Sequence, residues 1–274
     1  MPIQRLGFGY RGIAMAVALS NTLQPIVLLI YINLFARHTL QCWPGLSVKG
    51  AFQNWGPMVK LAIPGIAMTL SEWLAFDILT FAASYISAAH LASQSVLITV
   101  SITMFHVAMP VAVAASTRFG TLIGRGALQA ARRVFKYYYL TFIGLGLFNF
   151  TLLASLRHPI ASAFSSDPAV CKIIETVLPV VAVQQLVDTT AILSNALLRG
   201  LGRQKIGGWI NLGSYYPIGI PLSLFLAFGP PKLELIGLWI GPCVCLGIVT
   251  CTLFCYMRWT DWQKSVDAAR DRCE

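Results

Sequence analysis

Apolar residues dominate this chain in long runs, and polar segments interrupt those runs at fairly regular intervals. Each run reaches about 20 residues, the length that an α-helix needs to cross a bilayer. A helix on the surface of a soluble protein would instead carry a polar face along its whole length. The pattern predicts seven transmembrane helices, at about 12–36, 61–86, 91–116, 138–157, 174–198, 208–228 and 235–257.

Composition favours a membrane protein over a soluble or nucleic-acid-binding one. Of the 274 residues, 57% are hydrophobic and only 11% are charged, and the mean hydropathy is +0.70. The net charge of +10 is compatible with nucleic acid binding, but the basic residues stand in short connectors between the apolar runs. The sequence therefore predicts an all-α, polytopic membrane protein that resides in the lipid bilayer and has no nucleic acid partner.

The basic residues also predict the orientation of the chain. Fifteen of the 20 Lys and Arg residues fall in the connectors 37–60, 117–137 and 199–207 and in the C-terminal tail. Because cytoplasmic loops carry an excess of Lys and Arg, these segments and the C-terminus are expected in the cytoplasm. The connector 117–137 is basic and amphipathic, so we expect it along the inner membrane surface, together with a short interfacial helix at about 46–56.

Three acids lie well inside the predicted spans, away from their ends: Glu72, Asp77 and Asp188. A carboxylate at the centre of a membrane helix costs about 2.5–3.5 kcal/mol on insertion scales, so it is usually functional. Glu72 lies 12 residues from the cytoplasmic entry near Lys60, and Asp188 lies 11 residues from the exit at Arg199. Both are therefore expected roughly 16–18 Å from the same face, whereas Asp77 is about 7.5 Å further out and about 140° around the helix.

The two acids at matching depth suggest ion exchange. No arginine or lysine lies at that depth to neutralise them, so each is expected to take up a proton readily. Two acids that face one cavity can hold a proton or an organic cation in its place, which is the simplest physical basis for an antiporter. The alternative is that each acid is protonated and hydrogen-bonded to a neighbouring helix as a structural contact.

Other residues near the acids give weaker evidence for a functional site. Trp73 could offer a cation–π face to an organic cation, although Trp is equally common facing lipid. Pro64 and Gly65 precede Glu72 by one to two turns, and Pro217 interrupts the sixth predicted span, so all three are candidate hinge positions. No His/Asp or Cys/His cluster lies at a membrane face, which disfavours an enzyme with catalytic residues and predicts no metal site.

Five segments of the chain together resemble a known family. They are AIPGIAMTLSEWLAFDILTFAASYI, LASQSVLI, PVAVAASTRFGTLIGRGALQAARR, LLRGLGRQKIGGWINLGSYYPIGIPLSLFLAF and LELIGLWIG. In order and spacing they resemble the eukaryotic branch of the multidrug and toxic compound extrusion (MATE) transporters. The resemblance runs from about residue 6 to residue 262, and the patterns AASTRxGxLIGxG and LRGxGRQKIG are its most specific parts.

The resemblance implies a fold, an activity and a site. The fold would be twelve transmembrane helices in two six-helix lobes, and the activity would be proton-coupled export of small organic cations. Glu72, Asp77 and Asp188 would match the carboxylates of the cation site in the C-terminal lobe, with Gln94 beside them. Animal members have a further glutamate where this chain has Thr99. Composition alone does not separate sodium from proton coupling; the resemblance favours the proton as coupling ion, with no other cofactor.

The resemblance also implies a domain organisation. Residues 1–36 would be a leading helix equivalent to the last helix of a missing N-terminal lobe, 37–60 a cytoplasmic linker, 61–257 a six-helix C-terminal lobe and 258–274 a cytoplasmic tail. Such a lobe is expected in the plasma or vacuolar membrane and would transport only together with another lobe. The alternative is a truncated, non-transporting membrane paralogue or a partner subunit.

Overall fold

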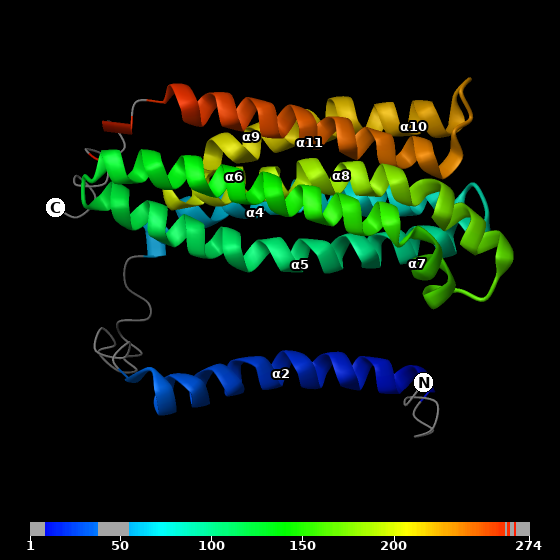
Figure 1. Cartoon of the computed structure of the whole chain (residues 1–274), viewed down its shortest axis with the longest axis horizontal. Helices are drawn as coiled ribbons and strands as arrows, with labels where there is room; N and C mark the ends of the chain where they lie inside the picture. The colour runs from blue at the N-terminus through cyan, green and yellow to red at the C-terminus, as the bar shows by residue number, and fades with distance from the viewer. Residues whose placement is uncertain (1–8, 38–54, 261, 264–265, 267–274) are drawn as a thin grey trace. The chain divides into compact units, whose positions relative to one another are not determined.

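The computed structural model describes residues 9–37, 55–260, 262, 263 and 266, and it contains no strand within these ranges (Figure 1). Seven helical segments are long and apolar enough to cross a membrane: Ala14–Phe35, Met58–Ser84, Ala88–Gly124, Leu128–Ser155, Pro168–Gly200, Gln204–Phe228 and Glu234–Trp259. These segments confirm the prediction of an all-α protein with seven candidate transmembrane helices.

The chain divides into two compact units, residues 1–55 and 56–274. The helix of the first unit is α2, Gly9–Phe35, which continues through Pro25. The interfacial helix predicted at 46–56 falls almost wholly on 38–54, outside the described residues.

The second unit is a bundle of helices. Its elements are α4 (Trp55–Ser84), α5 (Ala88–Gly124), α6 (Leu128–Ser155), α7 (Arg157–Phe164), α8 (Pro168–Gly200), α9 (Gln204–Ser214), the π-helical turn η2 (Tyr215–Gly219), α10 (Ile220–Phe228) and α11 (Glu234–Trp259).

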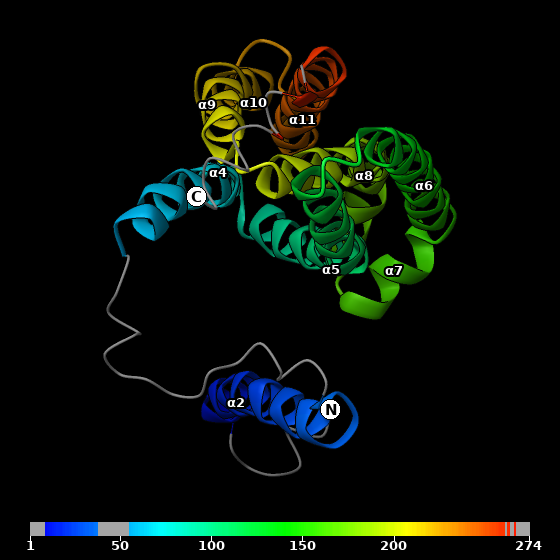
Figure 2. The ribbon, with the colours of Figure 1, turned by 90° about the vertical axis from the view of Figure 1, so that its left-hand side faces the viewer.

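Helix α8 is the centre of this bundle. It packs closely against α5, α6 and α11, and the end-on view shows it surrounded by them (Figure 2). Its start is well defined, because the Asp167 side chain accepts a hydrogen bond from the backbone N–H of Ala169 and Pro168 occupies the first turn. Since most residues of its second half are buried, α8 can present polar side chains to the interior without contact with lipid.

The connector between α5 and α6 differs from the prediction. The range 117–137 was expected as a surface segment, but α5 continues to Gly124 and α6 begins at Leu128. Gly126, at a φ of 70°, makes the tight turn between them, a conformation that glycine adopts at little cost. Of the basic residues in this range, Arg118, Arg132, Arg133 and Lys136 therefore lie on the helices, and Arg125 lies in the turn.

Two further boundaries differ from the predicted ones. Helix α4 begins at Trp55, so the last residues of the expected linker 37–60 are helical. The sixth span is not one continuous α-helix, because η2 separates α9 from α10 around Pro217. A proline has no backbone N–H to donate to the carbonyl four residues earlier. Pro217 lies in η2 and Pro221 in the first turn of α10, which accounts for the change of helix type.

The outer surface of the second unit suits a bilayer. Large apolar side chains such as Leu140 on α6, Leu147 on the same helix and Phe225 on α10 are more than half exposed. Most of the polar side chains that are buried instead lie on α5, α8 and α9. This inside-out distribution of polarity is what a helical membrane bundle requires.

Candidate functional site

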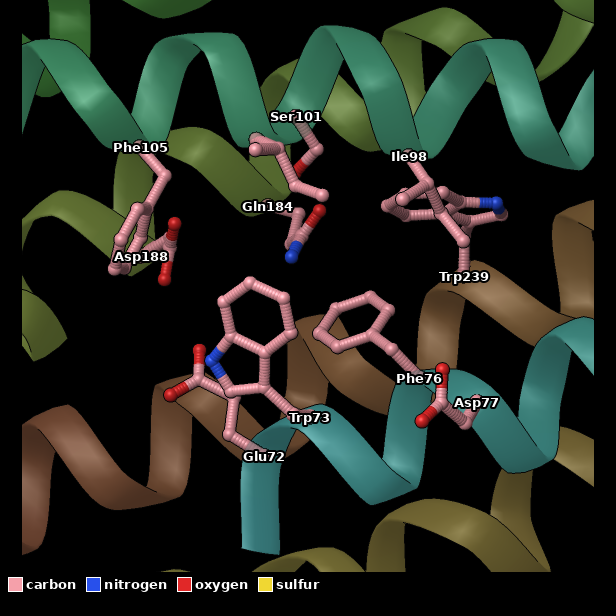
Figure 3. A pocket seen from close by; sticks show the side chains of 11 residues that line it. Glu72, Trp73, Phe76, Asp77, Ile98, Ser101, Phe105, Gln184, Asp188 and Trp239 are labelled. Carbon is pink, nitrogen blue, oxygen red and sulfur yellow. The ribbon is translucent and has the colours of Figure 1, made fainter. Parts of the chain in front are cut away.

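A cavity of about 160 Å³ lies between α4, α5, α8 and α11 (Figure 3). Its wall combines acidic, amide and hydroxyl side chains with aromatic rings, and no basic residue is among the lining residues: Glu72, Trp73, Phe76, Asp77, Ile98, Ser101, Ile102, Phe105, Gln184, Asp188 and Trp239. The structure thus brings Glu72, Asp77 and Asp188 to one cavity.

The pair Glu72 and Asp188 forms one end of the cavity. Figure 3 shows both carboxylates at this end, Glu72 on α4 and Asp188 on α8, with Asp77 at the other end beyond the Phe76 ring. Asp188 is buried and Glu72 is half-buried, and they lie near enough for their negative charges to repel each other. A proton or a bound cation between them relieves that repulsion. Asp77 is exposed and stands apart from this pair.

One cation acts on Glu72 from outside the cavity. Arg199, in the last turn of α8, does not line the wall, but its charge attracts that of Glu72. The sequence analysis expected no arginine or lysine at the depth of the acids, and it did not consider the effect of Arg199 on Glu72. Counting residues along α8 places Arg199 far from Asp188, but such a count gives no information on its separation from Glu72 on α4.

Tyr215 is a neighbour of the acids that sequence analysis did not select as a site residue. It is buried in a cluster with Ala75 of α4 and Ala191 of α8, each one turn from an acid of the pair, and the charges of both acids act on it. Its hydroxyl makes no hydrogen bond within the described structure. The sequence signal was its place beside Pro217, where the π-helical turn carries the side chain into the bundle.

Aromatic rings form the wall between the two ends of the cavity. The Phe76 and Trp239 ring centroids are 5.8 Å apart, and Trp73 is 49% exposed at the cavity edge. Electron-rich ring faces at such a position can attract an organic cation. Trp239, near the start of α11, was not predicted as a site residue.

Gln94 acts on the cavity through Trp239. The indole Nε1–H of Trp239 donates a hydrogen bond of 2.8 Å to Gln94 Oε1, and both side chains are buried. Gln94 itself is not among the lining residues. A second cross-helix hydrogen bond, from Gln185 Nε2 to Ser101 Oγ at 2.7 Å, joins α8 to α5 beside the cavity. These two bonds fix the ring and hydroxyl that face the space.

Two polar side chains of α5, Thr99 from the sequence analysis and His106, do not line the cavity. Thr99 is exposed, does not line the cavity, and donates its hydroxyl to the Ser95 carbonyl within α5 at 2.7 Å. His106 is also exposed and bonds the Ile102 carbonyl through Nδ1 at 2.7 Å. Each of these side chains is therefore hydrogen-bonded to a carbonyl within α5.

The candidate hinge residues sit at close helix contacts. A Cβ on Gly65 would lie 2.5 Å from Gln204 Oε1, and a Cβ on Gly208 would lie 3.3 Å from the Pro64 carbonyl oxygen. Pro64 and Gly65 are therefore where α4 and α9 approach each other, and α4 continues through them. Pro217 lies in η2, the one place among these three where the helix departs from α geometry.

Comparisons with known proteins concern the family and the fold of the chain, not the site itself. The family model described as MatE matches residues 64–225, more than half of the chain. An uncharacterized transporter of Schizosaccharomyces pombe is 39% identical over 86% of this chain and 43% of that protein. Human multidrug and toxin extrusion protein 2 is 30% identical over 97% of this chain and 44% of its own length. The chain thus spans less than half the length of these relatives.

A solved structure shows the same arrangement of helices. The crystal structure of the eukaryotic MATE transporter AtDTX14 superposes with a TM-score of 0.87 at 25% sequence identity. The match covers 96% of this chain and 58% of that one.

Proposed function

Because this chain belongs to the MatE family of transporters, we propose that it forms the C-terminal lobe of a proton-coupled antiporter that exports organic cations. The observation that carries the proposal is the placement of Glu72 and Asp188 on one cavity wall without a lining cation. The proton and the substrate would occupy these carboxylates in turn. The membrane would be the plasma or the vacuolar membrane, with the C-terminus in the cytoplasm.

The exchange follows from charge. Two carboxylates that repel each other bind a proton or an organic cation more tightly than either would alone, and the two ligands compete. When protons enter from the more acidic side they displace the cation, and when protons leave the acids can bind a new one. The aromatic rings of Trp73 and Phe76 supply apolar and cation–π contact for a drug-like cation without a specific hydrogen-bond pattern. Broad specificity for organic cations fits that wall.

Asp77 has a different proposed role. It is exposed at the far end of the cavity, separated from the Glu72 and Asp188 pair by the Phe76 ring (Figure 3). An exposed carboxylate at that position would attract cations to the cavity on their way to or from the pair. It is not expected to hold the coupling proton, because it stays in contact with solvent or with the opposite lobe.

Transport needs a second lobe. The chain spans under half the length of the Schizosaccharomyces pombe and human relatives, and alternating access in transporters built from two lobes requires both to move against each other. The partner would be an N-terminal lobe, either in the same full-length protein or in another chain. The activity and substrates of the whole assembly therefore belong to this proposal.

The test is charge neutralisation in a two-lobe protein. The chain is joined to the first lobe of the Schizosaccharomyces pombe relative, reconstituted in liposomes, and assayed for pH-gradient-driven uptake of ethidium. Glu72→Gln and Asp188→Asn should each lower uptake by roughly tenfold or more, the loss expected for a charged contact of about 1.5–3 kcal/mol. Glu175→Gln is the matched control, because this α8 carboxylate pairs with His158 at 2.8 Å and does not line the cavity.

The uptake assay distinguishes the antiporter from a non-transporting membrane protein. Uptake that survives both neutralisations would remove the proposed mechanism. If the fusion folds and inserts but shows no gradient-driven uptake even with both acids intact, the result favours the second candidate function, which is a non-transporting membrane paralogue or partner subunit. That candidate is favoured by the length comparison alone.

A further inference from the structure

A second and larger hollow lies away from the candidate site. Helices α6 and α11 each pack on α8, and between them a groove of about 660 Å³ opens at the end where α6 begins and α11 ends. None of the residues that line the candidate site lines this groove. It is therefore a separate feature of the C-terminal unit.

The floor of the groove is a packed set of aromatic rings. Phe135 of α6 stacks on Phe254 of α11 with centroids 6.2 Å apart, and Tyr139 meets Phe254 edge-on at 5.0 Å. The Trp262 ring lies 5.5 Å from Phe135. The Tyr139 hydroxyl is hydrogen-bonded to Ser194 Oγ of α8 at 2.7 Å, which fixes the floor to the central helix. The apolar surface is thus preformed.

Three cations rim this floor. Arg132 and Lys136 stand one turn apart on α6, and Arg258 lies in the last turn of α11. All three are exposed, and no carboxylate is found among the described residues that line the groove. Nor does any of the three form an ion pair within the described part of the chain. The neighbouring Arg133 is exposed but does not line the groove, so the convergence is a property of these three residues.

Below the cations the groove continues as apolar surface. Leu140 and Ile143 of α6 line it and are 66% and 51% exposed. At a rise of 1.5 Å per residue, Ile143 lies roughly 16 Å from Arg132 along the helix. A positive rim followed by an apolar wall of this length matches the shape of a phospholipid, with a phosphate at one end and acyl chains at the other.

We propose that this groove binds an anionic phospholipid, with its phosphate between Arg132, Lys136 and Arg258 and an acyl chain along the aromatic floor. The Lys and Arg bias predicts that this end of the bundle faces the cytoplasm, where the membrane leaflet is rich in anionic lipid. Basic pockets between membrane helices on that side are suited to anionic headgroups. The proposal does not depend on the transport activity.

The test uses the 274-residue chain purified in a neutral detergent. Native mass spectrometry measures how much phosphatidylserine and phosphatidylcholine remain bound after incubation with an equimolar mixture of the two. The unmodified chain should retain phosphatidylserine preferentially. Removing the rim charges with Arg132→Gln, Lys136→Gln and Arg258→Gln together should weaken that retention by roughly tenfold or more. All three side chains are exposed, so the folded bundle should persist, which the elution volume and helicity check.

A charge-matched control separates a groove from general attraction. Arg118→Gln, Arg125→Gln and Arg133→Gln remove three exposed charges near the same end of the bundle but outside the groove, and retention should stay unchanged. Equal losses in the two triple variants would overturn the proposal, because they would show attraction by net charge only.

A second arm distinguishes a lipid from a free anion. Glycerophosphoserine, which has the headgroup without acyl chains, should fail to displace bound phosphatidylserine. Full displacement by this compound or by inorganic phosphate would show an anion site without a lipid groove and would also overturn the proposal. Partial filling of the apolar wall with Ile143→Trp should lower retention of the lipid while the rim charges remain.

Discussion

The hydrogen bond between Trp239 and Gln94 should stabilise the bundle and hold one wall of the cavity. Trp239 is 1% exposed and its Nε1–H donates to Gln94 Oε1 at 2.8 Å across the interface of α11 and α5. The substitution Gln94→Leu keeps the side-chain volume but removes the acceptor. The indole N–H would then be buried without a partner.

The expected cost can be bounded from two sides. An unsatisfied buried donor in a protein interior costs about 1–3 kcal/mol. Hydrogen bonds between membrane helices measure lower, about 0.6 kcal/mol on average and about 1.7 at most. We therefore expect Gln94→Leu to lower the free energy of unfolding by about 1–2 kcal/mol, which corresponds to a drop in melting temperature of about 2–8 °C at about 2–4 °C per kcal/mol.

A double-mutant cycle isolates the bond from other effects of each change. Trp239→Phe removes the donor and some packing, and the double variant Gln94→Leu with Trp239→Phe leaves neither polar group. Thermal unfolding in detergent, followed by tryptophan-independent far-UV circular dichroism, gives the four melting temperatures. The two single changes should sum to more destabilisation than the double variant shows, by about 1 kcal/mol. Thr99→Val, on the same helix but bonded only within it, is the control and should change stability little.

Additive effects in this cycle would refute the reasoning. They would mean that the two side chains contribute independently, and that the ring of Trp239 is positioned by packing against residues such as Phe76 rather than by Gln94.

Further predictions concern helix contacts and the residue beside the acids. Gly146→Ala should destabilise the protein by about 1–3 kcal/mol, because the added Cβ would lie 3.0 Å from the Leu186 carbonyl oxygen. On the same helix, a Cβ added by Gly144→Ala meets open space, so this change should be neutral or stabilising by up to about 1 kcal/mol. Thermal unfolding of the two variants measures the difference. Tyr215→Phe should leave the melting temperature unchanged or slightly raised, because its buried hydroxyl has no hydrogen-bond partner in the described structure; a drop of several degrees would show that the hydroxyl is bonded in the folded protein.

Hydrophobic patterning predicted the membrane architecture well for a physical reason. In lipid every spanning segment must satisfy its own backbone hydrogen bonds, so long apolar runs leave little choice but helices. The same pattern did not predict the helix ends at Gly124 and Leu128, because the basic residues there form helix as readily as loop and the turn depends on the single Gly126.

The acids of the site were accessible to sequence reasoning because depth follows from counting residues along a helix. Glu72 and Asp188 were expected at one level, and the structure brings them to one cavity. The rotation of each helix about its axis cannot be found by counting residues. Whether Thr99 faces the cavity, or the charge of Arg199 acts on Glu72, depends on how neighbouring helices are turned, and the sequence of one chain carries no direct signal for that.

Trp239 and Tyr215 are two residues near the site that the sequence did not identify. Both are aromatic residues in apolar helices, where a position facing lipid and a position facing the interior look alike in sequence. Their roles depend on partners from other helices, Gln94 for the one and the α4 and α8 surfaces for the other. Only the packed structure identifies those partners.

The central claim is that a proton and an organic cation compete for Glu72 and Asp188. It is tested most directly by counting the protons released when a quaternary ammonium cation binds, from isothermal titrations in buffers of different ionisation enthalpy. Since protonated acids do not attract a cation, binding should weaken as the pH falls, and about one proton should be released per cation at the pH where the acids are partly protonated. Glu72→Gln with Asp188→Asn should abolish the release, and Glu175→Gln should preserve it. Cation binding without proton release, or release that persists in the double variant, would contradict the account.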